Sequence, residues 1–172
     1  MKRTVILYWP KGGNTEKAAR IIKETFGDDA DLFDIKSFNT DDLDKYDLVI
    51  TGASTIGAEN WEDASNDNEW NRFGIEARKK DFTGKYVAFF GLGDQVLYPN
   101  HFVDVLGVFQ EEFSKVGAKI IGRWPTEGYR FTDSDGAENG MFYGLALDED
   151  NESDLTRERV EKWVAQLKKE MS

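Results

Sequence analysis

Short apolar runs alternate with amphipathic segments along this chain, and the alternation predicts a parallel β-sheet covered by helices on both faces. Most of these runs are almost continuously apolar, as expected of strands that are buried on both sides. The run at 30–35 is weaker and alternates with polar residues, so we expect it near the sheet edge. The predicted strands are residues 5–9, 30–35, 48–51, 86–90 and 120–121.

The segments between the runs predict helices with one apolar face. Residues 14–26 have this pattern, and a second stripe recurs at i, i+3, i+4, i+7, i+11 and i+14 over residues 102–116. Thr156 is a suitable N-cap for a last helix that buries apolar side chains over 160–167. Together these elements predict an α/β fold of three layers around a doubly wound, five-stranded parallel sheet.

Two long segments interrupt the alternation. Residues 53–70 form an acidic, Asn-rich connection, and residues 126–140 form a polar loop that precedes another apolar run at 141–147. Loops of this length within a compact domain are usually functional. We expect the second to split the fifth strand in two, as an insertion at about 125–141 in a single domain that spans residues 1–172.

Charge narrows the range of partners. The 172 residues include 33 acidic and 22 basic ones, a formal net charge of −11, which argues against binding to nucleic acid or to anionic membrane surfaces. Six acids and no base lie between Lys45 and Arg72, and eight acids and no base lie between Arg130 and Arg157. Such concentration favours partners with basic docking faces, although acidity also serves solubility alone.

Several kinds of chemistry are absent from the sequence. The chain has no cysteine, which excludes disulfides, thiolate metal sites and iron–sulfur clusters, and its single histidine, His101, leaves no His-rich metal site. No pairing of a nucleophile with a base is evident, so we expect neither a catalytic residue nor a metal. The first residues lack the features of a signal peptide, and we expect a cytoplasmic protein.

The turn after the first strand is a candidate anion site. It reads Pro10-Lys11-Gly12-Gly13-Asn14-Thr15 and opens a predicted helix, so free backbone N–H groups and the positive end of the helix dipole meet there. The spacing matches neither a Walker loop nor the three-glycine dinucleotide fingerprint. The same turn could simply cap the helix.

Two further loops are expected beside it. The loop after 48–51 contains Ser54, and the loop after 86–90 reads Gly91-Leu92-Gly93-Asp94-Gln95 and continues to Tyr98. The second of these offers backbone amides and one aromatic face, which suits a flat ring with polar edges. Ligands of doubly wound sheets bind where such loops converge at the carboxyl ends of the strands, a rule for which FMN-binding flavodoxins are themselves a standard example.

The motifs resemble those of long-chain flavodoxins over essentially the whole length. Besides 91–95 and Tyr98, the matching stretches are Trp-Pro-Thr-Glu-Gly-Tyr at 124–129, Gly-Leu-Ala-Leu-Asp-Glu-Asp at 144–150, and the start of the last helix at 155–164. The resemblance implies the strand order 2-1-3-4-5 and one non-covalently bound FMN. It also implies a monomeric, low-potential one-electron carrier that serves redox enzymes such as flavin reductases and iron–sulfur oxidoreductases.

Two loops depart from the family pattern. Flavodoxin phosphate loops usually read Thr/Ser-x-Thr-Gly-Asn-Thr, whereas Pro10 and Gly12 occupy the two hydroxyl positions here. The charge of Lys11 would offset that loss, although an outward, solvated side chain is its default placement. After Thr55, where the family usually has Trp, this chain has Ile56, so either Ile56 or Trp61 covers the inner ring face; we favour Ile56.

The resemblance also assigns roles near the ring edge. A peptide carbonyl of the 50s loop accepts a hydrogen bond from the reduced flavin, and Gly57 is placed to allow the peptide to turn. Partners are expected to dock on nearby acids, which are Glu59, Glu62, Asp63, Asp67 and Glu69.

Two other classes share this fold. An FMN-dependent quinone or NAD(P)H reductase is the alternative, although Tyr98 would obstruct a substrate above the ring. A response-regulator domain needs acids at the ends of strands one and three, and those ends are Trp9-Pro10 and Thr51-Gly52.

Overall fold

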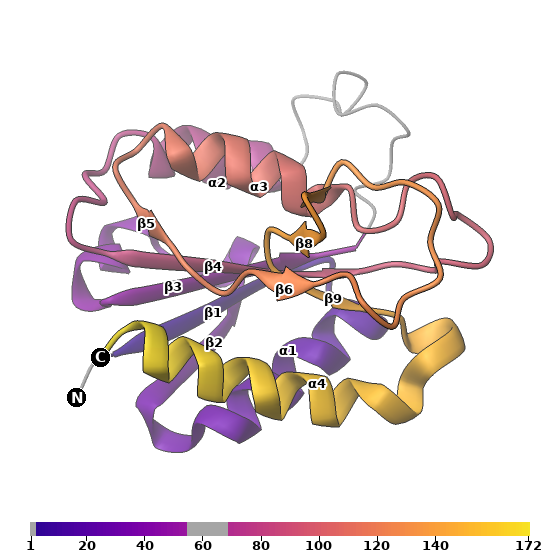
Figure 1. Ribbon diagram of the computed structural model, residues 1–172. Helices are drawn as coiled ribbons and strands as arrows, with labels where there is room; N and C mark the ends of the chain where they lie inside the picture. Colours follow the sequence, from indigo (N-terminus) through magenta and orange to yellow (C-terminus); the bar gives the residue numbers. More distant parts are fainter. Residues whose placement is uncertain (1–2, 55–68) are drawn as a thin grey trace.

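The computed structural model describes residues 3–54 and 69–172, which form a parallel sheet between two layers of helices (Figure 1). The sheet order is β2-β1-β3-β4-β5, and β9 also pairs with β4. The predicted order 2-1-3-4-5 is therefore confirmed, with the weak run at 30–35 at the edge. The strands are β1 Thr4–Trp9, β2 Ala30–Asp34, β3 Leu48–Ala53, β4 Tyr86–Leu92, β5 Lys119–Ile120 and β9 Leu145–Leu147.

The fifth strand position is filled by two separate strands, as predicted. β5 pairs with the start of β4, where Lys119 lies beside Tyr86, and β9 pairs with its end, where Ala146 lies beside Gly91. Residues 121–144, which we call the insertion, leave the sheet between them. Within the insertion a small antiparallel sheet has the order β6-β8-β7. Its strands are β6 Trp124–Pro125, β7 Ala137–Glu138 and β8 Met141–Phe142.

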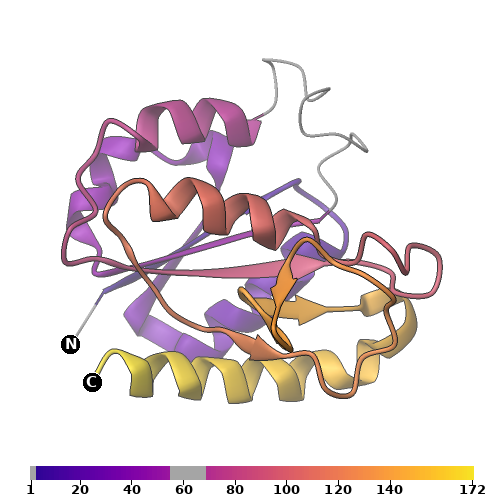
Figure 2. The same cartoon turned by 45° about the horizontal axis from the view of Figure 1, so that its top comes forward.

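Helices cover both faces of the main sheet. α1 and α4 lie on one face, and α2 and α3 lie on the other (Figures 1 and 2). Their bounds are α1 Asn14–Phe26, α2 Glu69–Ala77, α3 Val105–Ser114 and α4 Glu149–Glu170, and short 3-10 helices occupy Gly27–Asp29, Ile35–Ser37 and Thr40–Lys45. The predicted bounds of α1 are correct. α2 was not predicted, although Trp70, Phe73 and Ala77 bury one helical face at i, i+3 and i+7.

Two helix starts differ from the prediction. α3 begins at Val105 rather than at Phe102, because Val103 has a φ of 50° that no α-helix accommodates. Phe102 is buried against rings of the insertion instead, with centroid distances of 5.9 Å to Tyr129 and 5.7 Å to Phe131.

The prediction that Thr156 is the N-cap of the last helix is wrong. Asp148 caps α4, and its carboxylate accepts a hydrogen bond from the Asn151 N–H at 3.1 Å. The helix bends at Glu152 (φ −136°, ψ 40°) before its long apolar-faced part. Thr156 is buried inside the helix and donates its hydroxyl to Glu149 Oε2 at 2.9 Å.

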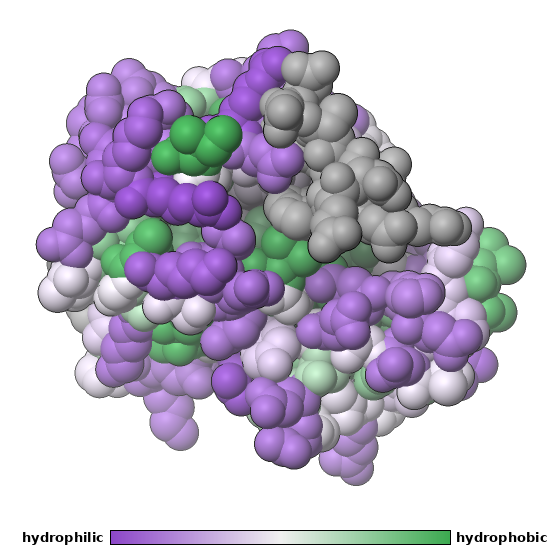
Figure 3. Space-filling view, turned by 90° about the horizontal axis from the view of Figure 1, so that it is seen from above, coloured by the Kyte–Doolittle hydropathy of each residue, from purple (hydrophilic) through white to green (hydrophobic). Residues whose placement is uncertain are grey.

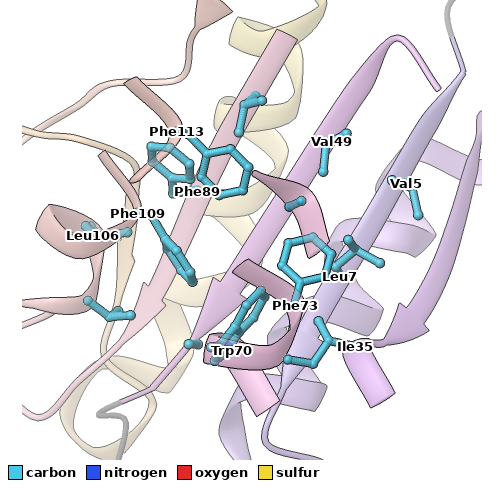
Figure 4. Close-up of a cluster of buried hydrophobic side chains, with 14 of the residues drawn as sticks. Val5, Leu7, Ile35, Val49, Trp70, Phe73, Phe89, Leu106, Phe109 and Phe113 are labelled. Atoms are coloured by element: carbon cyan, nitrogen blue, oxygen red, sulfur yellow. The ribbon is translucent and has the colours of Figure 1, made fainter. Parts of the chain in front are cut away.

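Apolar side chains fill both spaces between sheet and helices. Toward α2 and α3 the core is rich in aromatic side chains (Figure 4), with ring centroids 5.0 Å apart for Trp70 and Phe109 and 5.5 Å apart for Phe89 and Phe109. Burying one such side chain contributes roughly 1.5–3 kcal/mol. Toward α1 and α4 the indole N–H of Trp163 donates to Gly122 O at 2.8 Å, which ties α4 to the insertion. Burial on both faces explains the continuous apolar strand runs.

The face of the molecule over α2 and α3 is mostly polar. Seen from the side of α2 and α3, hydrophobic groups form separate patches between polar ones (Figure 3). Among residues 3–54 and 69–172, no helix combines the length and the apolarity needed to cross a bilayer.

Candidate functional site

The carboxyl ends of the central strands lie in one row. Trp9 of β1 pairs with Ala53 of β3, Ala53 pairs with Gly91 of β4, and Gly91 pairs with Ala146 of β9. Neighbouring strands are about 4.8 Å apart, so the loops that leave β1 and β4 start roughly 10 Å apart. Because of this register, the three predicted loops begin side by side at the carboxyl ends of the strands, between the two helix layers.

The turn after β1 is an open backbone cradle. Gly12 and Gly13 have φ values of 75° and 78°, and beyond the adjacent residues no atom of the described chain lies within 4 Å of where a Cβ would be on either of them. Side chains other than glycine rarely adopt this conformation, which explains both glycines. α1 begins at Asn14 without a side-chain cap, so within residues 3–54 and 69–172 no capping side chain competes with a ligand for its first amides.

Thr15 supplies a hydroxyl to the same cradle. Its side chain is only 1% exposed, yet Oγ1 has no hydrogen-bond partner among the described residues. A buried hydroxyl without a partner costs free energy, and such groups are rare in folded proteins. An anion bound to the first amides of α1 would satisfy this hydroxyl together with those amides.

The charged member of this turn already has a partner. Lys11 is exposed, and its Nζ lies 3.7 Å from Asp34 Oδ2. Asp34 also caps the short helix that follows it, through the N–H and the hydroxyl of Ser37 at 3.1 and 2.9 Å. The Lys11 side chain is therefore exposed, as expected, and is paired with Asp34. Pro10 and Asn14 are exposed beside it.

The glycines of the β4 loop are required for close packing rather than for a tight turn. Gly91 and Leu92 still belong to β4, and neither Gly91 nor Gly93 has a positive φ. A Cβ on Gly93 would lie 2.8 Å from Phe102 Cδ1, and one on Gly91 would lie 3.3 Å from the Leu106 side chain. Leu92 buries its side chain in the core toward α1 and α4, so only its backbone faces this edge.

Asp94 organises the turn that follows. Its Oδ1 accepts hydrogen bonds from the N–H groups of Val96 and Leu97 at 3.0 and 2.9 Å and from Asn151 Nδ2 at 2.8 Å. These bonds, that from Leu97 above all, lower the pKa of Asp94 below its ordinary value. The backbone N–H of Tyr98 donates to Asp94 O at 2.9 Å.

The tip of this turn presents apolar side chains to solvent. Val96, Leu97 and Tyr98 are 55%, 71% and 62% exposed. The loop protrudes at the right of Figure 1, and a hydrophobic group stands out on the same side in Figure 3. Next to it, His101 Nδ1 lies 2.9 Å from Asp104 Oδ2, and this hydrogen bond raises the pKa of His101. An exposed ring on a hydrogen-bonded turn is a platform for a flat ligand.

The predicted loop after β3 is described only as far as Ser54. Ser54 is half-buried at the end of β3. Thr55, Ile56, Gly57 and Trp61 lie outside the described residues, so the choice between Ile56 and Trp61 stays a prediction.

Most of the predicted docking acids belong to the same stretch of the chain. Glu59, Glu62, Asp63 and Asp67 also lie outside the described residues. Glu69 opens α2, where its carboxylate is largely buried and lies 3.2 Å from Arg72 Nη1.

Three acids in the second acidic stretch are internal, contrary to the reading of these carboxylates as docking surface. Asp148 is fully buried as the cap of α4. The carboxylate of Glu149 is buried and lies 2.7 Å from Lys17 Nζ, and that of Glu152 pairs with Arg159 at 3.3 Å. The sequence pattern concealed these roles because caps and internal ion pairs look like ordinary surface acids. In the part of the chain that the structure describes, no group of three His, Cys, Asp or Glu side chains could hold a metal ion.

The arrangement fits a phosphorylated ligand that carries a flat ring. The Gly12–Gly13 cradle and the Thr15 hydroxyl suit the phosphate, and Tyr98 suits the ring, with both loops at one end of the sheet. This combination matches the donor set that flavin mononucleotide requires.

Comparison with known proteins gives a consistent result. The flavodoxin family model matches residues 6–163. The chain is 42% identical to a Nostoc flavodoxin over 170 residues, which cover 98% of this chain and 97% of the relative. It is 41% identical to flavodoxin 1 of Escherichia coli over 173 residues, which cover 99% of this chain and 96% of the relative. The crystal structure of Fusobacterium nucleatum flavodoxin bound to flavin mononucleotide superposes with a TM-score of 0.85 at 29% identity and covers 99% of both chains. The chain therefore belongs to the flavodoxin family, and to its long-chain type.

Proposed function

We propose that this protein holds one FMN at the described edge of the sheet and carries single electrons at low potential between redox enzymes. Flavodoxins are FMN-binding electron carriers and not enzymes, so the family supports this function. The observation that carries the proposal is the buried hydroxyl of Thr15, which has no partner among the described residues, beside two open glycines.

Each part of the site has a separate task. The backbone amides of residues 11–15 and the Thr15 hydroxyl bind the phosphate, and Tyr98 covers the outer face of the ring. Ile56, or alternatively Trp61, covers the inner face, and the peptide next to Gly57 accepts a hydrogen bond at the ring edge. When bound, FMN supplies the one-electron chemistry, and the protein sets its potential and its accessibility.

Negative charge near the ring keeps the potential low. Asp94 lies in the ring-binding turn, and hydrogen bonds hold its pKa below the ordinary value, so it is ionised at neutral pH. The protein as a whole carries a formal charge of −11. Adding an electron at this edge is therefore opposed by the protein's own field.

The partners that we propose are redox enzymes with basic docking faces, such as flavin reductases and iron–sulfur oxidoreductases, met by a monomer in the cytoplasm. The charge and the family support partners of this kind. Reduction by such a reductase should slow as ionic strength rises to physiological values, where the Debye length is about 8 Å. Neutralising Glu59, Glu62, Asp63 and Asp67 together should flatten this salt dependence. A rate indifferent to salt and to these substitutions would contradict electrostatic docking.

Phosphate recognition is tested by comparing FMN with riboflavin, which lacks the phosphate. Because the Thr15 hydroxyl has no protein partner among the described residues, Thr15→Val should leave the FMN-free protein as stable as wild type or more so. It should weaken FMN binding by about 1.5–3 kcal/mol, the range for hydrogen bonds to charged groups, and leave riboflavin binding unchanged. Fluorescence titration of the stripped protein measures both affinities.

Thr25→Val is the matched control. Thr25 lies in the same helix and donates its hydroxyl to Ile21 O at 2.8 Å, away from the cradle. It should affect neither affinity. Equal losses for FMN and riboflavin in Thr15→Val would refute the assignment of Thr15 to the phosphate.

A further inference from the structure

Gln95 is buried inside an otherwise exposed turn. Gln95 is 1% exposed, although the three residues that follow it, Val96, Leu97 and Tyr98, lie on the surface. Its side-chain Nε2 donates to Glu152 Oε1 at 2.5 Å, and its Oε1 accepts from the backbone N–H of Arg130. The amide thus connects the ring-binding turn to α4 and to the insertion at once.

Glu152 is held in place from the other side. It interrupts α4, and its carboxylate also lies 3.3 Å from Arg159 Nη1, with only 13% and 12% of the two side chains exposed. The Arg159 guanidinium in turn lies over the ring of Tyr129, 4.2 Å from its centroid. Gln95 is therefore attached to a continuous set of polar contacts that crosses from α4 to the insertion.

A second tether lies just beyond Tyr98. The carbonyl of Pro99 accepts hydrogen bonds from the N–H groups of Thr132 and Asp133 at 2.7 and 2.9 Å. Tyr98 thus lies between two attachments to the same part of the insertion, at Gln95 and at Pro99. Because Tyr98 is 62% exposed, these attachments rather than packing of the side chain determine where the ring stands.

We infer that Gln95 is a positioning residue for flavin binding, which holds the Tyr98 turn through Glu152 and the insertion. The inference rests on the proposed function. Only a side chain with both a donor and an acceptor satisfies the two contacts, because Glu152 requires a donor and the Arg130 N–H requires an acceptor. Glutamine meets this requirement, and glutamate does so only when it is protonated.

Gln95→Glu therefore makes the position of the turn depend on pH. The new carboxyl would share a nearly buried space with another carboxylate, which raises the pKa of one member of such a pair. Tyr129 lies under Arg159 on the side of the insertion. Its phenol stays neutral between about pH 5 and pH 8, the interval of the measurement below, because burial raises its pKa to about 12. Among the described residues, the charged groups around the new carboxyl are the adjacent Asp94, Asp148, which accepts from the Gln95 backbone N–H, Glu152, and Arg159, which compensates them.

The measurement is the FMN dissociation constant of the stripped variant relative to that of wild type at each pH. At about pH 8, where both carboxyls are ionised, the ratio should be about 10- to 100-fold, and it should approach one toward about pH 5 as a proton bridges the pair. Using the ratio removes the pH dependence that FMN and the rest of the site contribute.

The double variant Gln95→Glu/Glu152→Gln reverses the donor and the acceptor. The amide introduced at position 152 would donate to the carboxylate introduced at position 95 and could no longer repel it. The new carboxylate would still accept from the Arg130 N–H, and the new amide oxygen would still accept from Arg159. The double variant should therefore restore wild-type affinity at about pH 8 and remove the extra pH dependence. A contribution of Gln95 that did not depend on its hydrogen bond to Glu152 would not produce this reciprocal rescue.

Gln166→Glu is the matched control. It introduces the same change in α4, where Gln166 Nε2 donates to Arg123 O at 2.8 Å and lies near Glu170. At about 1.5 Å per residue, Gln166 lies roughly 20 Å along the helix from Glu152. Its affinity ratio should stay near one at every pH.

The outcomes separate the two claims. A Gln95→Glu ratio near one at all pH values, or a double variant that folds without regaining affinity, overturns the inference while the proposed function stands. If Gln95→Glu alone does not fold, the double variant decides the matter, because it must fold and bind FMN as wild type does. Failure of the wild type itself to bind FMN refutes the proposed function and, with it, this inference.

Discussion

Replacing Tyr98 by alanine should separate ligand binding from folding. Tyr98 is 62% exposed, and its backbone N–H should stay bonded to Asp94 O in the variant. Exposed substitutions of this kind usually change stability by less than about 0.5 kcal/mol. We therefore expect the urea unfolding curve of the FMN-free protein to be unchanged.

FMN binding should weaken by about 2–3 kcal/mol. An aromatic side chain buries roughly 150–250 Å² when fully covered. If the ligand covers half of the exposed part of Tyr98, it removes roughly 60 Å² from water, worth about 1.5 kcal/mol at about 25 cal/mol per Å². Ring–ring contact adds about 0.5–1.5 kcal/mol. The sum corresponds to a loss of affinity of roughly 30- to 150-fold.

Fluorescence titration measures the affinity, and a redox titration should show a raised reduction potential because water reaches the ring. Leu97→Ala is the matched comparison, since it removes exposed apolar surface from the same turn without removing a ring. Equal effects of the two variants, or an unchanged affinity in Tyr98→Ala, would refute the assignment of Tyr98 to the ring face.

Two further predictions concern the support of the site. Gly93→Ala places a Cβ 2.8 Å from Phe102 and should destabilise the FMN-free protein by about 1–3 kcal/mol in urea unfolding, and an unchanged midpoint would show that Phe102 yields freely. Tyr129→Phe leaves Ala146 O and the Trp124 indole N–H without a partner and should cost about 1–3 kcal/mol near neutral pH. Burial raises the folded pKa of Tyr129 to about 12, above its ordinary value of 10.0, so the wild type retains this contribution below about pH 10 and loses it as pH rises toward about 12. The stability difference between wild type and variant should therefore shrink over that interval, and a constant difference would contradict the role assigned to burial.

Some expectations failed because tertiary contacts overrode local pattern. The stripe from Phe102 looked helical because apolar spacing does not reveal which surface each side chain meets, and Phe102 meets the insertion. Thr156 looked like a cap, but Asp148 lies at the end of β9 and is placed by the sheet to cap α4. α2 was overlooked because its short apolar stripe adjoins a long polar connection.

The sequence by itself determined the layers, the strands and the loops that form the site. Continuous apolar runs can be buried only in a sheet that is covered on both faces, and the Gly12–Gly13 turn and the 91–98 motif are local signals that need no partner. Only the tertiary structure decided which groups are left unsatisfied and which are tied together. Three features depend on residues distant in sequence. They are the missing partner of Thr15 Oγ1 among the described residues, the internal places of Asp148 and Glu152, and the double attachment of Gln95. Such contacts follow from strand register and from the path of the insertion, which no local pattern encodes.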